Sequence, residues 1–247
     1  MMHRLPFLTA LAIFATQAAA EPVLPKFDPA DFVPGAVIDN PYFPLVPGFR
    51  AESVGMTKDD AGKLVEQRSV SSYVEPGPML GGVASTLILD EVRNDGVLIE
   101  QTTDYYAQDR QGNVWYLGED SVEFKYDTKG QIVSKDPGGS WHAGVNGAQP
   151  GYAMPAALKP GFAYQQEHAP ADQALDQAEI VGVEGTLTIA GHVYDHVLSI
   201  AETTAIEPTA YEMKYYVPGV GVIRVEAGFD ANHANPDTHF DTLPTGK

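Results

Sequence analysis

Short runs of apolar, β-branched and aromatic residues, separated by turn sequences, recur along most of this chain. Alternation of apolar and polar residues within such runs is typical of strands that bury one face. The expected strands are 49–56, 64–74, 83–92, 97–108, 113–120, 121–126, 131–134, 180–189, 192–203, 211–217 and 220–227. Because the turns between them are short, strands that follow one another should also pair. We therefore predict a mainly β fold, a curved antiparallel sheet or half-barrel of about ten strands, with at most one short helix at 170–178.

The stretch 97–120 is predicted to form the central hairpin of this sheet. Its turn is expected at 109–112, where Gly112 supplies the positive φ. In this register Tyr106 faces Trp115 across the pair. Since side chains alternate along a strand, one face would gather Glu100, Asp104, Tyr106, Trp115 and Glu119. An acidic and aromatic face is unusual for a solvated surface, so it is the main candidate for a binding site; an outward polar face is the alternative.

Two further features are candidates for the same site. Glu212 and Lys214 share one face of an expected strand. Such a pair orients a ligand inside a barrel, whereas it contributes little at a surface. The long segment 137–160 breaks the strand rhythm with five glycines and four prolines, and we expect it to cover the sheet as a lid. Its Trp141 and Met154 would then lie above the ligand.

The three carboxylates of the central hairpin also suggest chemistry. Carboxylates on one face repel one another unless protons or a cation neutralise them, so Glu100, Asp104 and Glu119 are candidate ligands for Ca²⁺. No EF-hand spacing occurs, and no other cofactor is predicted. The chain also lacks P-loop, dinucleotide-binding, HExxH and nucleophile-elbow motifs. If the protein is a hydrolase or lyase, Asp104 and Glu119 are its candidate general acid and base.

The first 20 residues have the pattern of a secretory signal peptide. Arg4 precedes an apolar run, and an Ala-x-Ala sequence predicts cleavage after Ala20. The run is shorter than the ~20 residues that span a bilayer, so no membrane anchor is expected and the mature protein is predicted to be periplasmic or secreted. Without cysteine, neither disulfides nor a lipidated cysteine is expected. The net charge of −18 disfavours nucleic acid and anionic lipid as partners.

The mature chain is predicted to hold a single β domain at 49–229. A Pro-rich segment, 21–48, should pack across that domain, because its prolines exclude a regular helix and its aromatic residues favour burial. The polar tail, 230–247, is expected to be loose. Nothing in the sequence fixes the oligomeric state.

Three stretches carry a resemblance. They are DNPYFPLVPG from Asp39, DYYAQDRQGNVWYLGED from Asp104 followed by GSWHAGVNGAQPGYAMPA from Gly139, and EMKYYVPGVGVIRVE from Glu212. Together they resemble a family of secreted bacterial proteins of unknown function, whose landmarks read NPYFPL.PG, D.YAQD..GNVWY.GE, GSW.AG and KYYAPGVG. The last stretch is also similar to the closing hairpin of periplasmic lipoprotein-carrier (LolA-like) half-barrels. That resemblance implies a curved sheet around an apolar interior, although this chain has no convincing helix to fill it.

The leading hypothesis is an exported, non-enzymatic protein that binds a small or apolar ligand inside the curved sheet. Tyr106 and Trp115 would lie near the mouth of the site, beneath Trp141 and Met154. An acidic Ca²⁺-binding protein and a hydrolase or lyase with paired carboxylates are the alternatives.

Overall fold

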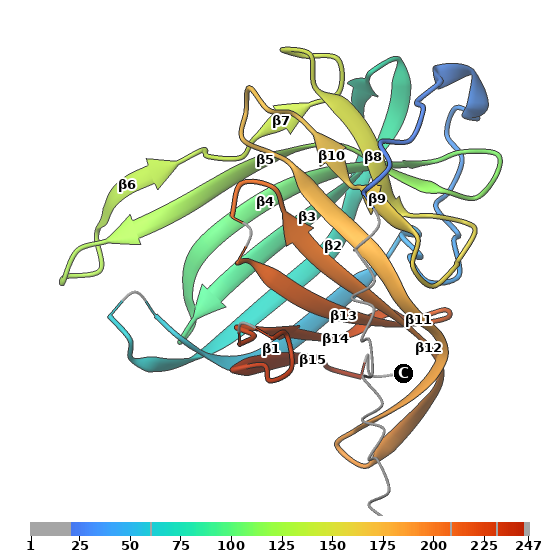
Figure 1. Ribbon diagram of the computed structural model, residues 1–247. Coiled ribbons are helices and arrows are strands. Elements are labelled where there is room, and N and C mark those ends of the chain that lie inside the picture. The colour runs from blue at the N-terminus through green and yellow to red at the C-terminus, as the bar shows by residue number, and fades with distance from the viewer. Residues whose placement is uncertain (1–20, 60, 208, 231, 245–247) are drawn as a thin grey trace, which may run out of the picture.

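The computed structural model describes residues 21–59, 61–207, 209–230 and 232–244, so the predicted signal peptide lies outside it. The described residues form an all-β fold with no α-helix and one 3₁₀ turn, η1 (Pro29–Asp31). Thirteen strands follow one another in a single sheet, which curves until it is nearly closed into a barrel (Figure 1). The predicted curved antiparallel sheet is confirmed.

The strands are β1 (Arg50–Lys58), β2 (Leu64–Leu80), β3 (Val83–Asn94), β4 (Val97–Gln108), β5 (Val114–Tyr126), β6 (Ile132–Asp136), β7 (Trp141–His142), β8 (Gln149–Met154), β9 (Ala163–Gln165), β10 (Glu167–His168), β11 (Asp176–Ile189), β12 (His192–Thr204), β13 (Tyr211–Val217), β14 (Gly221–Ala227) and β15 (Thr238–Thr242). From β1 to β5, and again from β11 to β14, each strand pairs with the next along the chain, as short turns require. Within the described residues no helix is long and apolar enough to cross a membrane.

The C-terminal part joins the sheet rather than hanging free. Strand β15 pairs with β1 on one side and with β14 on the other, and so connects the two meanders. The prediction of a loose tail over 230–247 is therefore wrong for this strand. Its alternating side chains explain the difference, because Phe240 and Thr242 both turn toward the barrel interior.

A short stretch around Gln166 brings the two ends of the sheet together. On one side of Gln166, β9 pairs with β11; on the other side, β10 pairs with β8. The Gln166 backbone N–H donates to the Asp176 carbonyl at 2.9 Å. The chain itself thus crosses from one edge of the sheet to the other within a few residues, which protects both edges from pairing with other molecules.

The segment 137–160 belongs to the sheet wall and is not a lid. Both β7 and β8 pair with β5. A Cβ atom at Gly151 would lie only 2.0 Å from the Gln165 carbonyl oxygen, so this glycine permits close backbone contact where the barrel nearly closes. The predicted helix at 170–178 is also absent: these residues form a turn and the start of β11.

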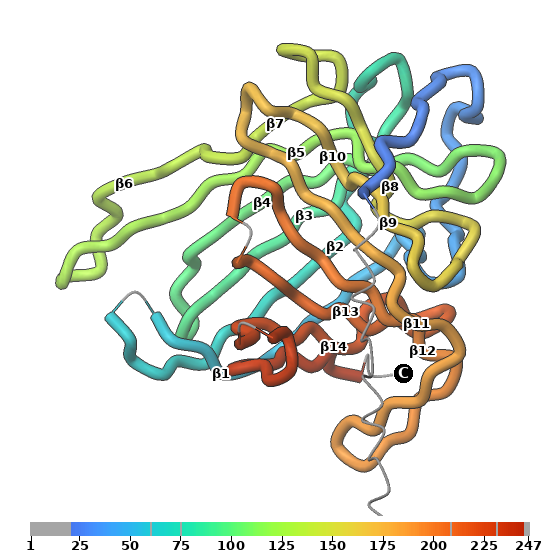
Figure 2. The backbone as a smooth tube through the Cα atoms, viewed as in Figure 1, coloured from blue at the N-terminus to red at the C-terminus, as the bar shows by residue number. Residues whose placement is uncertain are grey.

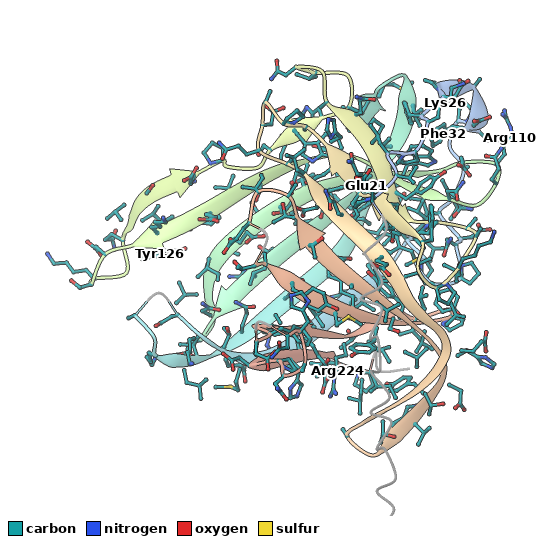
Figure 3. The ribbon with its side chains drawn as sticks, viewed as in Figure 1. Glu21, Lys26, Phe32, Arg110, Tyr126 and Arg224 are labelled. Carbon is teal, nitrogen blue, oxygen red and sulfur yellow. The ribbon has the colours of Figure 1, made fainter. Side chains whose placement is uncertain are left out.

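The Pro-rich segment 21–48 packs along the outside of the barrel and over one end of it (Figure 2). Val23 forms a bridge with Tyr164, and Phe32 forms one with Asp109. Ile38 is fully buried in the main apolar cluster. Phe32 and Arg110 lie in the same corner of the molecule (Figure 3), where the Arg110 backbone N–H donates to the Asp31 carbonyl at 2.9 Å.

Candidate functional site

The register of the central hairpin differs from the predicted one at two points. Near the turn, Tyr106 pairs with Tyr116 instead of Trp115. A bulge follows, beyond which Asp104 pairs with Glu119. Each point shifts the pairing by one residue, and a one-residue shift exchanges the two faces of a strand. Beyond the bulge both shifts apply, and Glu119 returns to its predicted face. Between the turn and the bulge only the first shift applies, so Tyr116 takes the place predicted for Trp115.

The side chain of Asp109 explains the first shift. Its Oδ1 accepts the backbone N–H groups of Gln111 and Asn113 at 2.9 and 3.0 Å. The Asp109 N–H in turn donates to the Asn113 carbonyl at 3.0 Å. The turn therefore closes at Asp109 and Asn113, whereas the prediction closed it at Gln108 and Asn113, and the strand pairing moves by one residue. An aspartate that binds the backbone beyond it is expected to fix a turn in this way.

Trp115 consequently lies on the outer face of the hairpin, away from the acidic residues. It is 3% exposed, and its ring packs edge-on against Phe27 at 5.2 Å and Tyr152 at 4.6 Å. Its indole Nε1 donates to Asp109 Oδ2 at 2.8 Å. The prediction that Trp115 shares the face of Asp104 is wrong; this residue anchors the N-terminal segment and the turn.

We expect Trp115→Phe to lower the free energy of unfolding by about 1–2 kcal/mol, because the Asp109 carboxylate loses a buried donor. Urea denaturation followed by tyrosine fluorescence or circular dichroism would measure the change. Trp141→Phe is the matched control, since Trp141 is equally buried but its Nε1 forms no hydrogen bond of normal geometry and interacts with Glu167, whose pKa it lowers, rather than with the turn. Equal losses for the two variants would show that the Trp115–Asp109 hydrogen bond contributes nothing.

The inner face of the barrel encloses a cavity of about 590 Å³. Side chains from β1 to β5, β11 and β13 to β15 line it. Of the nine predicted site residues, six lie on its wall: Glu100, Asp104, Tyr106, Glu119, Glu212 and Lys214. The other three, Trp115, Trp141 and Met154, are buried in the surrounding packing and do not line it.

One end of the cavity is closed by the NPYFPL motif. Phe43 and Leu45 line the cavity, and the Phe43 ring lies edge-on to Tyr106 at 5.3 Å. Asn40 holds this plug in place: its Nδ2 donates to the Gly112 carbonyl at 2.9 Å. The Gly219 backbone N–H donates to the Pro41 carbonyl at 2.7 Å.

The plug residues Asn40 to Leu45 are functional candidates that the sequence reasoning left out of the site. Their contacts run from the first motif to the second at Gly112 and to the third at Gly219. The signal was present in the sequence as three motifs without an assigned role. What the sequence did not show is that they meet at one end of the barrel.

The most buried acid of the cavity is Asp104, which is 5% exposed. Its Oδ1 accepts the Tyr116 hydroxyl at 2.5 Å. Burial, followed by the charge of Asp90, raises the pKa of Asp104 well above its usual range. Burial likewise raises the pKa of Asp90. Burial also raises the pKa of Glu119, to about 7, so around neutral pH the site offers both proton donors and acceptors.

Lys214 is the one cation on the cavity wall among the described residues. Its Nζ lies 2.5 Å from Glu202 Oε2. Burial lowers the pKa of Lys214, but the carboxylates around it, Glu202 first, outweigh this effect and the pKa is raised. Burial raises the pKa of the neighbouring Glu212. Lys214 is therefore a permanent positive charge that is already paired.

The predicted Ca²⁺ ligands are not gathered around one point. Glu100 and Asp104 are four residues apart on β4, or about 13 Å along the strand. Asp104 lies beside Glu119, whereas Glu100 lies beside Glu123. Within the described part of the chain, no group of three or more His, Cys, Asp or Glu side chains is arranged to hold a metal ion. The geometry thus gives the Ca²⁺ hypothesis no support.

No family model and no curated protein matches this chain, so the motif resemblance to a secreted family has no independent support. Two solved structures are similar to it. One is described as "a putative lipoprotein" of Parabacteroides distasonis, with a TM-score of 0.39 and 13% identity over 81% of this chain and 96% of that chain. The other is a DUF1329 family protein of Desulfovibrio piger, with a TM-score of 0.26 and 9% identity over 78% and 82%.

Proposed function

We propose that this protein binds a small, partly apolar molecule inside its barrel. The observation that carries the proposal is the cavity of about 590 Å³ on the inner face of the sheet. Its volume falls in the range of roughly 300–1,000 Å³ that is typical of sites for drug-sized ligands. Together with the predicted export signal, this suggests a protein that holds or carries its ligand outside the cytoplasm.

The plugged end of the cavity offers an apolar surface that a ligand could contact. Phe43 and Leu45 of the plug belong to one apolar cluster with Phe49, Ile88 and Tyr106, and all five line the cavity. Ile88 is 2% exposed, so the end is shielded from solvent. Transfer of each CH₂ group of a ligand from water to such a surface contributes about 0.8 kcal/mol.

The polar side chains on the rest of the wall support the proposal that the cavity orients its ligand. It carries serine and threonine hydroxyls from β1, β2, β4 and β15, and the acidic side chains described above. A cavity with an apolar end and polar groups on the rest of its wall fixes both the depth and the direction of a bound molecule. The same carboxyl groups belong to the barrel wall, so they are positioned before any ligand arrives.

Native mass spectrometry of the mature protein, purified from its own host under gentle conditions, tests the proposal. We expect a population of the chain with an additional bound mass, released by mild activation. A variant with the cavity filled, Ser69→Trp, is expected to lose this population, because Ser69 lines the cavity.

Val70→Trp is the matched control, since the neighbouring side chain on β2 points to the opposite face of the sheet. It should keep the bound mass. Recovery of an empty chain from the host, or equal loss in the two variants, would contradict binding inside the barrel.

A further inference from the structure

The cavity wall has a strong imbalance of charge. Six acidic side chains line it: Asp90, Glu100, Asp104, Glu119, Asp176 and Glu212. Lys214 is the single basic side chain among the described lining residues, and its ammonium group already pairs with Glu202. A bound anion would meet these carboxyl groups without a free cation to balance its charge. A bound cation would relieve their mutual repulsion.

An unpartnered oxygen identifies where such a cation would bind. Oδ1 of Asp90 has less than 1 Å² of exposed surface and no hydrogen-bond partner in the described structure, and Asp90 lines the cavity. Asp104 and Ser71 lie beside this carboxyl group and lower the pKa of Asp90 by hydrogen bonding. A carboxylate oxygen only accepts hydrogen bonds, so the partner that Oδ1 lacks is a donor. Buried acceptors without a donor are unfavourable, and more so when they are charged. An ammonium group supplies both the donor and the opposite charge.

The position of Asp90 relative to the apolar end sets the shape of the ligand. On β3, Asp90 is two residues from Ile88, and on β4, Asp104 is two residues from Tyr106. Two residues correspond to about 6.6 Å along a strand. Asp104 pairs directly with Ile88 and so borders the apolar surface, while Asp90, paired with Thr102, lies further from the plug.

We propose that the ligand is an amphiphilic organic cation, with its ammonium group at Asp90 and Asp104 and its apolar part against the plug. This inference rests on the proposed function and specifies the ligand class. It argues against a fatty acid as the ligand, because the carboxylate of a fatty acid would be repelled by the carboxyl groups of the wall. A purely apolar molecule would add no partner to the Asp90 carboxyl beyond the neighbouring Asp104 and Ser71.

Three probes with the same apolar chain and different head groups test the inference: octylammonium, 1-octanol and octanoate. Isothermal titration calorimetry on the mature protein at pH 7.5 would measure each affinity. We expect octylammonium to bind at least about tenfold more tightly than octanol, as one charge-assisted hydrogen bond implies. Octanoate should bind most weakly of the three.

Asp90→Asn should reduce the affinity for octylammonium about tenfold or more and leave that for octanol unchanged. Asp136→Asn is the matched control, because Asp136 is exposed on β6 and its loss changes the net charge by the same amount. An equal effect of the two variants would show that only long-range charge is involved, and would overturn the assignment of Asp90.

Two further outcomes separate this inference from the proposed function. Octanol or octanoate binding as tightly as octylammonium, with loss in Ser69→Trp, overturns the cation inference and leaves ligand binding in the barrel intact. Failure of all three probes, together with an empty chain in native spectra, overturns both.

Discussion

Replacing Lys214 with methionine is expected to lower the free energy of unfolding by about 3 kcal/mol at pH 7. The Lys214 and Glu202 side chains are only 27% and 15% exposed, and their charged atoms are 2.5 Å apart. Methionine fills a similar volume but leaves the Glu202 carboxylate unpaired, close to Glu212. Removing one partner of a buried pair leaves an uncompensated charge in a poorly solvated place, which accounts for most of the loss.

Urea denaturation monitored by tryptophan fluorescence would measure this change. Combining Lys214→Met with Glu202→Met should restore most of the stability, because the double variant removes both charges. Lys63→Met is the control for a surface pair, since Lys63 and Asp95 are both exposed, and it should change stability far less than Lys214→Met does. A loss for Lys214→Met no larger than that for Lys63→Met would mean that the pair is effectively solvated.

The meander could be predicted from the sequence because it is built from local contacts. Alternating runs such as 83–92, followed by Asn94-Asp95-Gly96, specify both a strand and its return. The closure of the barrel could not be predicted in this way. Strands β7 and β10 contain two residues each, which is too short for any periodicity. Gly151 looks like a loop residue in sequence, although it is needed for close contact between paired segments.

The predicted site shows how sensitive a strand register is to local chemistry. The Asp109 side chain tightens the turn, and a bulge adds a second shift, so Glu119 kept its predicted face while Trp115 did not. Neither shift changes the composition of the strand, so the sequence pattern alone does not reveal them. Asp90, by contrast, did leave a signal: it stands between Ile88 and Val92 on the inward face of an expected strand. An acid in that position indicates either a partner or a ligand.

Glu167→Gln is expected to stabilise the protein by about 2–4 kcal/mol at pH 7.5 and to have little effect at pH 4.5. Glu167 is 3% exposed, and its Oε2 has no hydrogen-bond partner. Burial, then the charges of Asp176 and Glu119, raises its pKa from 4.5 to about 9. The folded protein therefore keeps a proton on Glu167 at neutral pH, whereas the unfolded chain loses it.

The sign of the pH dependence follows from this difference. Below pH 4.5 both states hold the proton, and the contribution to stability is complete. Between pH 4.5 and about 9 only the folded state holds it, so unfolding releases a proton and stability falls as the pH rises. Glutamine resembles the protonated acid in shape and does not titrate, so the Glu167→Gln variant should lack this part of the decline.

Urea denaturation of both proteins from pH 4.5 to 9 would test the prediction. Glu66→Gln serves as the control, because it removes the same charge from an exposed carboxylate on β2. Parallel profiles for Glu167→Gln and the parent protein would show that Glu167 is ionised in the folded state. A cation or a donor would then have to compensate its charge, and the acidic region of the barrel would extend beyond the cavity wall to the closure at Gln166.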